Sequence, residues 1–278
     1  MSLPFVGDQD TDASAAPGQA ILAEAVGAYR NALGERLLAA YALGSLAHGG
    51  FSPLVSDVDL GLVLTDPLQE DDGATIAPIA ETLRAGGSDL HQRLSVFWGT
   101  LSTLRGDAQG GRFPPLDRLD LIEHGRLLDG EDVRAALPWP TRRDILVAGA
   151  EFALDSLSPD EPQRPELLLA RGVRHVTKVV LFPVRFLYAA ETGSVGTNHG
   201  AVEHYLAITK APGRELVAAA LGWRRTPPGN DDALPLLRRE LIPLYLLYLD
   251  DHVARLTEAG FPALARAFAD WRERVTVA

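Results

Sequence analysis

The 278-residue chain contains no cysteine. This absence excludes disulfide bonds, thiolate metal ligands and cysteine nucleophiles, so any metal or catalytic site must use oxygen and nitrogen groups. The chain also lacks an uninterrupted run of roughly 18 apolar residues, the length that a membrane-spanning helix needs. Its start has no basic segment followed by an apolar core, so no secretory signal peptide is expected. These absences favour a cytoplasmic protein that does not bind membranes.

Positive charge is also scarce, and two common catalytic motifs are missing. With 26 Lys and Arg against 37 Asp and Glu, the net charge is −11. A chain of this charge repels phosphates in general, so broad nucleic-acid binding is not expected. Neither a G-x-S-x-G nucleophile elbow nor a G-x-x-x-x-G-K-[ST] phosphate loop occurs, which argues against the hydrolases and the nucleotide-binding enzymes that use them.

The hydrophobic pattern predicts an α+β first part and an all-α second part, with a boundary near residue 140. Residues 1–16 are polar and aperiodic, which predicts a flexible head. Residues 17–140 form the first expected domain and residues 141–278 the second, a helical bundle.

The expected elements follow from the spacing of apolar residues and from the positions of Gly and Pro. In the first domain, helices are expected at residues 18–33 and 76–84, and strands at 37–43, 57–64, 93–98 and within 116–128. In the second domain, helices are expected at 142–156, 165–191, 199–208, 213–222, 232–258 and 261–275. Pro183 and Pro243 fall inside helical patterns, where they should kink or break the helix.

One string, YALGSLAHGGFSPLVSDVDL from Tyr41 to Leu60, concentrates the residues that can carry chemistry. Because side chains alternate along a strand, Asp57 and Asp59 point to the same side, with Cα atoms roughly 6.6–6.8 Å apart. Two neighbouring carboxylates repel each other unless a cation lies between them. Mg²⁺ (or Mn²⁺) prefers such oxygen ligands and brings substrate phosphates with it. The aspartate pair is therefore predicted to be a metal site.

Gly44 and Ser45 interrupt the preceding strand and are expected to begin a short helix. Glycine lets the backbone approach a phosphate closely, and helix N-terminal amides with a serine hydroxyl can then hold it. His48, in the same loop, is a further candidate for a phosphate contact, with an ordinary loop histidine as the alternative. A phosphate cradle facing a carboxylate pair would supply the positioning and charge neutralisation that nucleotidyl transfer needs.

The pattern apolar-Gly-Ser, 11 further residues and then Asp-apolar-Asp-apolar resembles the signature of the polymerase-β-type nucleotidyltransferase superfamily. Ser56, just before the first aspartate, and the Gly49–Gly50 pair resemble the small bacterial members of that superfamily. The alternative is a structural turn followed by a solvated aspartate pair.

The resemblance implies a nucleotidyltransferase-fold domain with a small mixed sheet. It also implies that ATP or another NTP, bound with Mg²⁺, is the co-substrate. The catalytic and metal-binding residues would be Asp57 and Asp59, and the nucleotide-binding residues of this domain would be Gly44, Ser45 and Ser56.

The second half resembles the helical C-terminal domain of aminoglycoside adenylyltransferases. The resemblance rests on Arg185 and on Thr192–Gly193 after it. It implies a nucleotide that is held between two domains and bound by Arg185. The alternative is that Arg185 is an ordinary exposed arginine on a long helix. The lysine that these enzymes tend to place after Thr-Gly is replaced here by Asn198, with His199 beside it.

The expected third strand departs from the family. Active members usually carry a third carboxylate there, but residues 93–98 read RLSVFW, with Ser95 and no acid on either face. The nearest acids, each expected to lie at the surface, are Asp89, Asp117, Asp120 and Glu123.

The sequence thus predicts a nucleotidyltransferase that transfers a nucleoside monophosphate to a hydroxyl of a small, aminoglycoside-like molecule. The alternative, favoured by the missing acid, is a catalytically degenerate nucleotide-binding or regulatory protein of the same fold. The sequence does not specify the acceptor or the oligomeric state.

Overall fold

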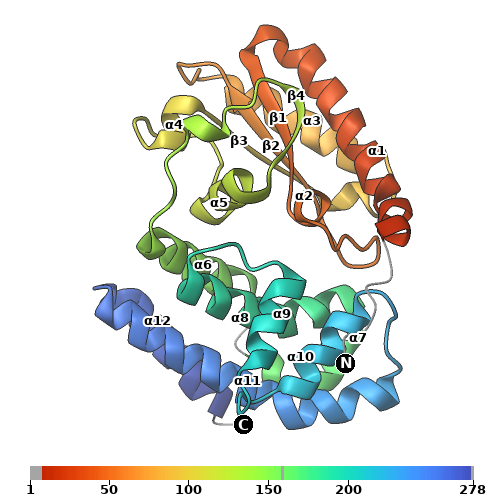
Figure 1. The fold of residues 1–278 in the computed structure, drawn as a ribbon, viewed down its shortest axis with the longest axis vertical. Coiled ribbons are helices and arrows are strands. Elements are labelled where there is room, and N and C mark those ends of the chain that lie inside the picture. The colour runs from red at the N-terminus through yellow and green to blue at the C-terminus, as the bar shows by residue number, and fades with distance from the viewer. Residues whose placement is uncertain (1–7, 158–159, 277–278) are drawn as a thin grey trace. The chain divides into compact units, whose positions relative to one another are not determined.

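The computed structural model describes residues 8–157 and 160–276, with side chains from residue 14 onward. It divides into two compact units, Met1–Trp139 and Pro140–Ala278, which we call the N-terminal and C-terminal units (Figure 1). Among the residues that the structure describes, none of the helices is both long and apolar enough to cross a membrane.

The N-terminal unit is built on a four-stranded sheet, ordered β3-β2-β1-β4. Its strands are β1 (Leu37–Leu43), β2 (Val58–Leu64), β3 (Leu94–Thr100) and β4 (Arg126–Gly130). Strand β1 is antiparallel to both β2 and β4, whereas β2 is parallel to β3. The parallel pair needs a crossover, which α3 (Asp72–Ala85) supplies. The predicted small mixed sheet is therefore confirmed.

The two faces of this sheet have different roles. Val58, Leu60 and Leu62 are fully buried in a core shared with α1 (Asp8–Leu33) and α3. Because side chains alternate along the strand, Asp57 and Asp59 lie on the opposite face. That face is covered by α5 (Pro115–His124) and, near its edge, by the short helix α4 (Leu101–Arg105), whereas Leu46 of the short helix α2 (Ser45–His48) packs in the core shared with α1 (Figure 1).

The first helix begins earlier than expected. Helix α1 starts at Asp8, so residues 8–16 of the predicted flexible head are helical, and residues 1–7 lie outside the described residues. The segment is rich in alanine, the best helix former, and Ala15 packs against the core of the sheet. This contact attaches the first turns of α1 to the core, which the polar composition of the segment did not indicate.

The fourth strand was predicted within 116–128, and it is present only at the end of that segment, most of which is a helix. Helix α5 covers Pro115–His124, and only Arg126–Gly130 is extended. Pro115 suits the first turn of a helix, and Leu116, Leu119 and Ile122 recur three residues apart, which is a helical spacing. Asp120 therefore lies on a helix that packs on the sheet.

The C-terminal unit is all-α, as predicted. Its helices are α6 (Arg142–Ser156), α7 (Pro165–Ala170), α8 (Val173–Thr192), α9 (Asn198–Ala207), α10 (Arg214–Trp223), α11 (Asn230–Glu258) and α12 (Pro262–Thr276). The single helix expected at 165–191 is two helices, because Gly172 adopts φ 89°, a left-handed conformation that favours glycine. Neither Pro183 nor Pro243 ends its helix, since α8 and α11 continue through them.

Aromatic rings from α11 and α12 fill the core of the C-terminal unit. Tyr248 lies 5.8 Å from Phe268 between ring centroids, and Phe268 lies 5.7 Å from Trp271. His252 stacks on Phe268 at 5.6 Å and is only 1% exposed. Such aromatic pairs contribute about 0.5–1.5 kcal/mol each beyond the area that they bury.

We expect the buried His252 to make the protein less stable in acid. Burial lowers the pKa of His252, although the Asp251 carboxylate, 3.2 Å from Nδ1, opposes this shift. The folded protein therefore keeps the ring neutral, while the unfolded chain takes up a proton near pH 6.5. The free energy of unfolding should fall as pH drops below about 6.5, by at most about 1.4 kcal/mol per pH unit from this group.

Urea unfolding of the wild type and of His252→Phe, at about pH 7.5 and about pH 5.5, measures this effect. The variant keeps a ring on Phe268 and should lose less stability on acidification than the wild type. His199→Gln, at an exposed position, is the matched control. Equal acid sensitivity of wild type and His252→Phe would contradict the assignment.

Candidate active site

The turn after β1 is a tight one that only glycine fits. Gly44 has φ 59° and ψ −148°, a region that side chains rarely adopt, and its carbonyl accepts the Ala47 and His48 amides at 2.9 and 3.0 Å. A side chain at Gly44 would also collide with the Asp59 carboxylate. The Gly-Ser motif and the second aspartate are therefore packed directly against each other.

The two aspartates occupy the start of β2. Asp57 immediately precedes the strand, and Asp59 pairs in register with Leu43 at the end of β1. Both carboxylates are half-buried, whereas Val58 and Leu60 between and after them are fully buried on the other face. The structure thus places Asp57 and Asp59 on one face beside the Gly44–Ser45 turn.

Ser56 has a structural position in the loop that leads to the aspartates. Its side chain is buried, and its hydroxyl accepts the Ser52 amide at 3.0 Å. Arg93 donates to the carbonyls of Ser56 and Pro53 at 3.1 and 3.0 Å. These bonds fix the approach to Asp57, so Ser56 shapes the site from within the loop.

The position expected for a third acid is taken by Ser95. Ser95 is the registered partner of Asp59 across the parallel β2–β3 pair, and it lies on the same face of the sheet. Neighbouring strands lie about 4.8 Å apart, so a carboxylate at this position would adjoin Asp59. The serine is half-buried and supplies no charge.

An acid does reach the turn, but from helix α5. Asp120 is buried, and its Oδ2 accepts the Gly44 amide at 2.5 Å. Of the four acids expected at the surface, Asp89 is exposed and Asp117 and Glu123 are partly buried, so the prediction is wrong for Asp120. In α5, Asp120 lies between Leu119 and Leu121, and all three are buried. The burial of Asp120 was not expected because the segment was interpreted as a strand.

Asp120 also changes the expected phosphate cradle. Because it accepts the Gly44 amide, that amide is already bonded, and α2 has only four residues, so its dipole is small. Ser45, the first residue of α2, is half-buried in the same turn. His48 lies against His124 of α5, with ring centroids 5.5 Å apart, at the same end of the sheet.

The donor set fits Mg²⁺ only as a two-carboxylate site. Within the described residues, no group of three or more His, Asp or Glu side chains is arranged to hold a metal ion. Mg²⁺ is commonly bound by one or two carboxylates together with substrate phosphates, rather than by an all-protein cage. Asp57 and Asp59 match that mode, in which the nucleotide supplies the remaining ligands.

Within the C-terminal unit, Arg185 lies on α8. Its Nε donates to the Gly196 carbonyl, and its guanidinium lies 5.4 Å from the centre of the Phe182 ring. Burial, together with the positive charge of Arg185, lowers the pKa of Arg224 to about 10. Arg224 was not predicted from the sequence, because no motif marks an arginine in the turn after α10 that approaches Arg185.

No known family model matches the chain, and no curated protein sequence matches it. Among solved structures, it is similar to spectinomycin adenyltransferase AAD(9) from Enterococcus faecialis, crystallised with ATP and spectinomycin. The TM-score is 0.52 at 13% identity, covering 93% of this chain and 99% of that one. The chain therefore has the fold of a spectinomycin adenyltransferase, which confirms, at the level of the fold, the nucleotidyltransferase resemblance predicted from its Gly-Ser and Asp-x-Asp motifs.

Proposed function

We propose that the protein is a nucleotidyltransferase that moves a nucleoside monophosphate from Mg-bound ATP, or another NTP, to a hydroxyl of a small molecule. The observation that carries this proposal is the half-buried Asp57–Asp59 pair, with Asp59 packed against Gly44 of the Gly-Ser turn. Its occurrence in a chain with the fold of an ATP-bound adenyltransferase supports ATP as the nucleotide.

In this mechanism the chain's main task is to position phosphates and neutralise their charge. Asp57 and Asp59 would hold the Mg²⁺, which offsets the negative charge of the triphosphate. The Ser45 hydroxyl donates to a phosphate oxygen. The acceptor hydroxyl oxygen forms a bond to the α-phosphorus, and the bond from that phosphorus to the β-bridging oxygen breaks. Pyrophosphate leaves with the bonding electrons, and the hydroxyl proton passes to solvent or to a carboxylate.

Arg185 and Arg224 offer a second anion contact in the C-terminal unit. Two guanidinium groups that repel each other are stabilised by an anion, and a guanidinium group can donate two parallel hydrogen bonds to phosphate oxygens. We assign nucleotide binding to Arg185 on this basis, with Arg224 as its neighbour.

A cationic acceptor fits the charge of the chain. The net charge of −11 attracts a cation and repels an anion. An aminoglycoside-like molecule has both the positive charge and the hydroxyl group, and AAD(9) was crystallised with spectinomycin. A protein side chain that bears a hydroxyl is the other acceptor class.

A second candidate function is nucleotide binding without transfer. The observation that favours it is Ser95, which leaves no acid beside Asp59 on the neighbouring strand. The loss of a general base typically lowers a rate by about 10²–10⁴-fold. A protein with this site could still bind Mg–nucleotide and act as a regulator.

Transfer from ATP labelled at the α-phosphate, with Mg²⁺ and a panel of aminoglycosides and aminocyclitols, separates these functions. We expect label on at least one acceptor, with release of pyrophosphate. Calorimetry of Mg–ATP binding runs in parallel. Binding without transfer to any acceptor would support the regulatory candidate, and the absence of both would contradict the nucleotide site itself.

A further inference from the structure

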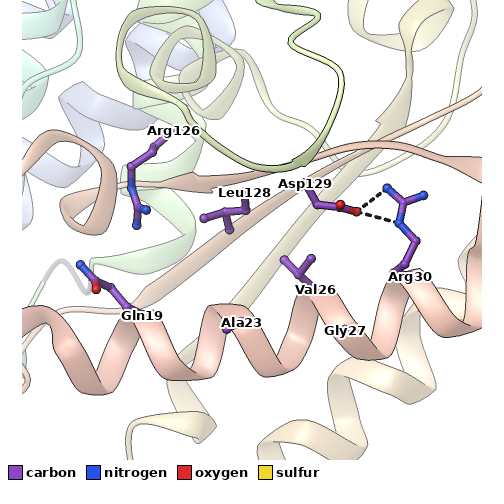
Figure 2. Close-up of a pocket in the computed structure, with 8 residues that line it drawn as sticks. All are labelled: Gln19, Ala23, Val26, Gly27, Arg30, Arg126, Leu128 and Asp129. Atoms are coloured by element: carbon purple, nitrogen blue, oxygen red, sulfur yellow. Dashed lines mark hydrogen bonds and ion pairs between the residues drawn. The ribbon is translucent and has the colours of Figure 1, made fainter.

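A groove lies between α1 and the edge strand β4, away from the aspartates (Figure 2). It has a volume of about 490 Å³, within the range of roughly 300–1,000 Å³ that is typical of small-molecule sites. We call it the α1–β4 groove. Its walls are formed mainly by Ala23, Val26, Gly27, Arg30, Arg126 and Leu128. Val26 and Leu128 pack against the core that the sheet shares with α1 and α3, so the groove lies on the opposite face from Asp57 and Asp59.

The two ends of the groove differ in charge balance. At one end, Arg30 donates to Asp129, with Nε at 2.6 Å from the carboxylate, so that cation is already neutralised. At the other end, Arg126 of β4 and Gln19 of α1 both line the groove, and Figure 2 draws no bond to Arg126 from the other lining residues. In the part of the chain that the structure describes, no hydrogen bond or ion pair engages the exposed Arg126 guanidinium. This end therefore presents an available positive charge from β4 and an amide donor from α1.

The middle of the groove is apolar. Val26 and Leu128 are only partly buried, and both pack against the core of the sheet (Figure 2). Ala23, one turn before Gly27, is exposed in the same wall. An apolar floor between a free cation and a neutralised ion pair suits a ligand with an apolar body and a single negative charge.

Gly27 is the second, independent observation. It lies in the interior of α1, where glycine weakens a helix relative to alanine, and a Cβ at this position would meet nothing within 4 Å. No neighbouring atom in the fold requires a glycine here. The missing side chain does, however, leave the wall of the groove open.

We propose that the α1–β4 groove binds a small apolar carboxylate, with the apolar body on Val26 and Leu128 and the carboxylate on Arg126 and Gln19. The groove is a second ligand site, and it does not depend on the transfer activity proposed above. The carboxylate forms a charge-assisted hydrogen bond with the guanidinium, and the apolar body leaves water.

Displacement of the fluorescent anion 1-anilinonaphthalene-8-sulfonate by octanoate tests the site, with octyltrimethylammonium as the cationic counterpart. Octanoate should displace the probe and the cation should not. Gly27→Leu fills the open space and should raise the dissociation constant of the probe by about tenfold or more. Gly222→Leu is the matched control, because Gly222 is also an exposed helical glycine whose Cβ would meet nothing within 4 Å.

Arg126→Gln tests the charge. Because the substitution removes one exposed charge contact, it should raise the dissociation constant of the probe by about three- to fivefold and reduce the salt dependence of its binding. Arg266→Gln, at an exposed position on α12, should leave binding unchanged. Equal affinities of Gly27→Leu and Gly222→Leu would overturn the site. Loss of binding in Gly27→Leu with no change in Arg126→Gln, or equal displacement by the cation, would overturn the assignment of an anionic ligand.

Discussion

Replacing Asp59 by asparagine is expected to lower nucleotidyl transfer by about three orders of magnitude without unfolding the protein. Asparagine keeps the shape that packs against Gly44 but removes the negative charge that would hold the cation. Stabilisation of the transferring phosphoryl group by a metal is worth several kcal/mol, and about 1.4 kcal/mol corresponds to a tenfold change in rate. The loss should therefore appear in kcat and remain at saturating ATP.

The measurement is transfer of α-labelled phosphate at high Mg²⁺, with a thermal melt to verify folding. Asp89→Asn is the matched control, because Asp89 is an exposed aspartate of the same unit. Calorimetry with Mg–ATP should in addition show weaker binding to Asp57→Ala than to the wild type. Equal binding by both would refute the metal site, and full activity of Asp59→Asn would refute the proposed mechanism.

The part of the site that could be predicted is the part that depends on local geometry. The two-residue period of a strand is enough to place Asp57 and Asp59 on one face and Val58 in the core. A glycine followed by serine at a strand end is enough to predict the turn at Gly44. The same period places Ser95 on a single face of its own strand, but only the parallel register pairs it with Asp59.

The part that could not be predicted depends on contacts between distant segments. Asp120 and Gly44 are 76 residues apart, and their hydrogen bond exists only because α5 packs on β1. In a strand, neighbouring side chains point to opposite faces, so a carboxylate between two buried leucines would point to the surface. In a helix, neighbouring residues can share one broad face, so the same carboxylate can be buried. Arg224 near Arg185 is a similar case, since the two residues belong to different segments of the C-terminal unit.

The fold shows the same division between local and distant effects. Helix α6 begins and ends where its periodicity predicts, because a Thr141 capping box fixes its start. The break at Gly172 was missed, because the apolar pattern of 165–191 continues across it. A positive φ leaves no periodic trace in a sequence, so a glycine within a helical pattern is ambiguous until the backbone is known.

The opposite change, Ser95→Glu, is expected to raise transfer activity by about tenfold to a hundredfold. It would place a carboxylate on the same face as Asp59, one strand away. The negative charge of Asp59 should raise the pKa of the new carboxyl towards neutrality, where a general base is most effective. The expected gain is smaller than the full effect of a general base, about 10²–10⁴-fold, because the surrounding side chains pack around a serine and will not hold a glutamate in the best position.

Ser95→Gln is the matched control, since it adds the same volume without the charge and should give no gain. The Glu variant should also melt at a lower temperature than the Gln variant without Mg²⁺, because a third carboxylate adds repulsion at the Asp57–Asp59 pair. Addition of Mg²⁺ should reverse that difference, since a cation offsets the repulsion and binds only the folded site. A gain in both activity and Mg²⁺ response would identify the absence of an acid at position 95 as what limits the proposed transfer. Equal rates for Ser95→Glu and Ser95→Gln would instead mean that proton removal from the acceptor does not limit transfer, and that the chain's own carboxylates or solvent already perform it.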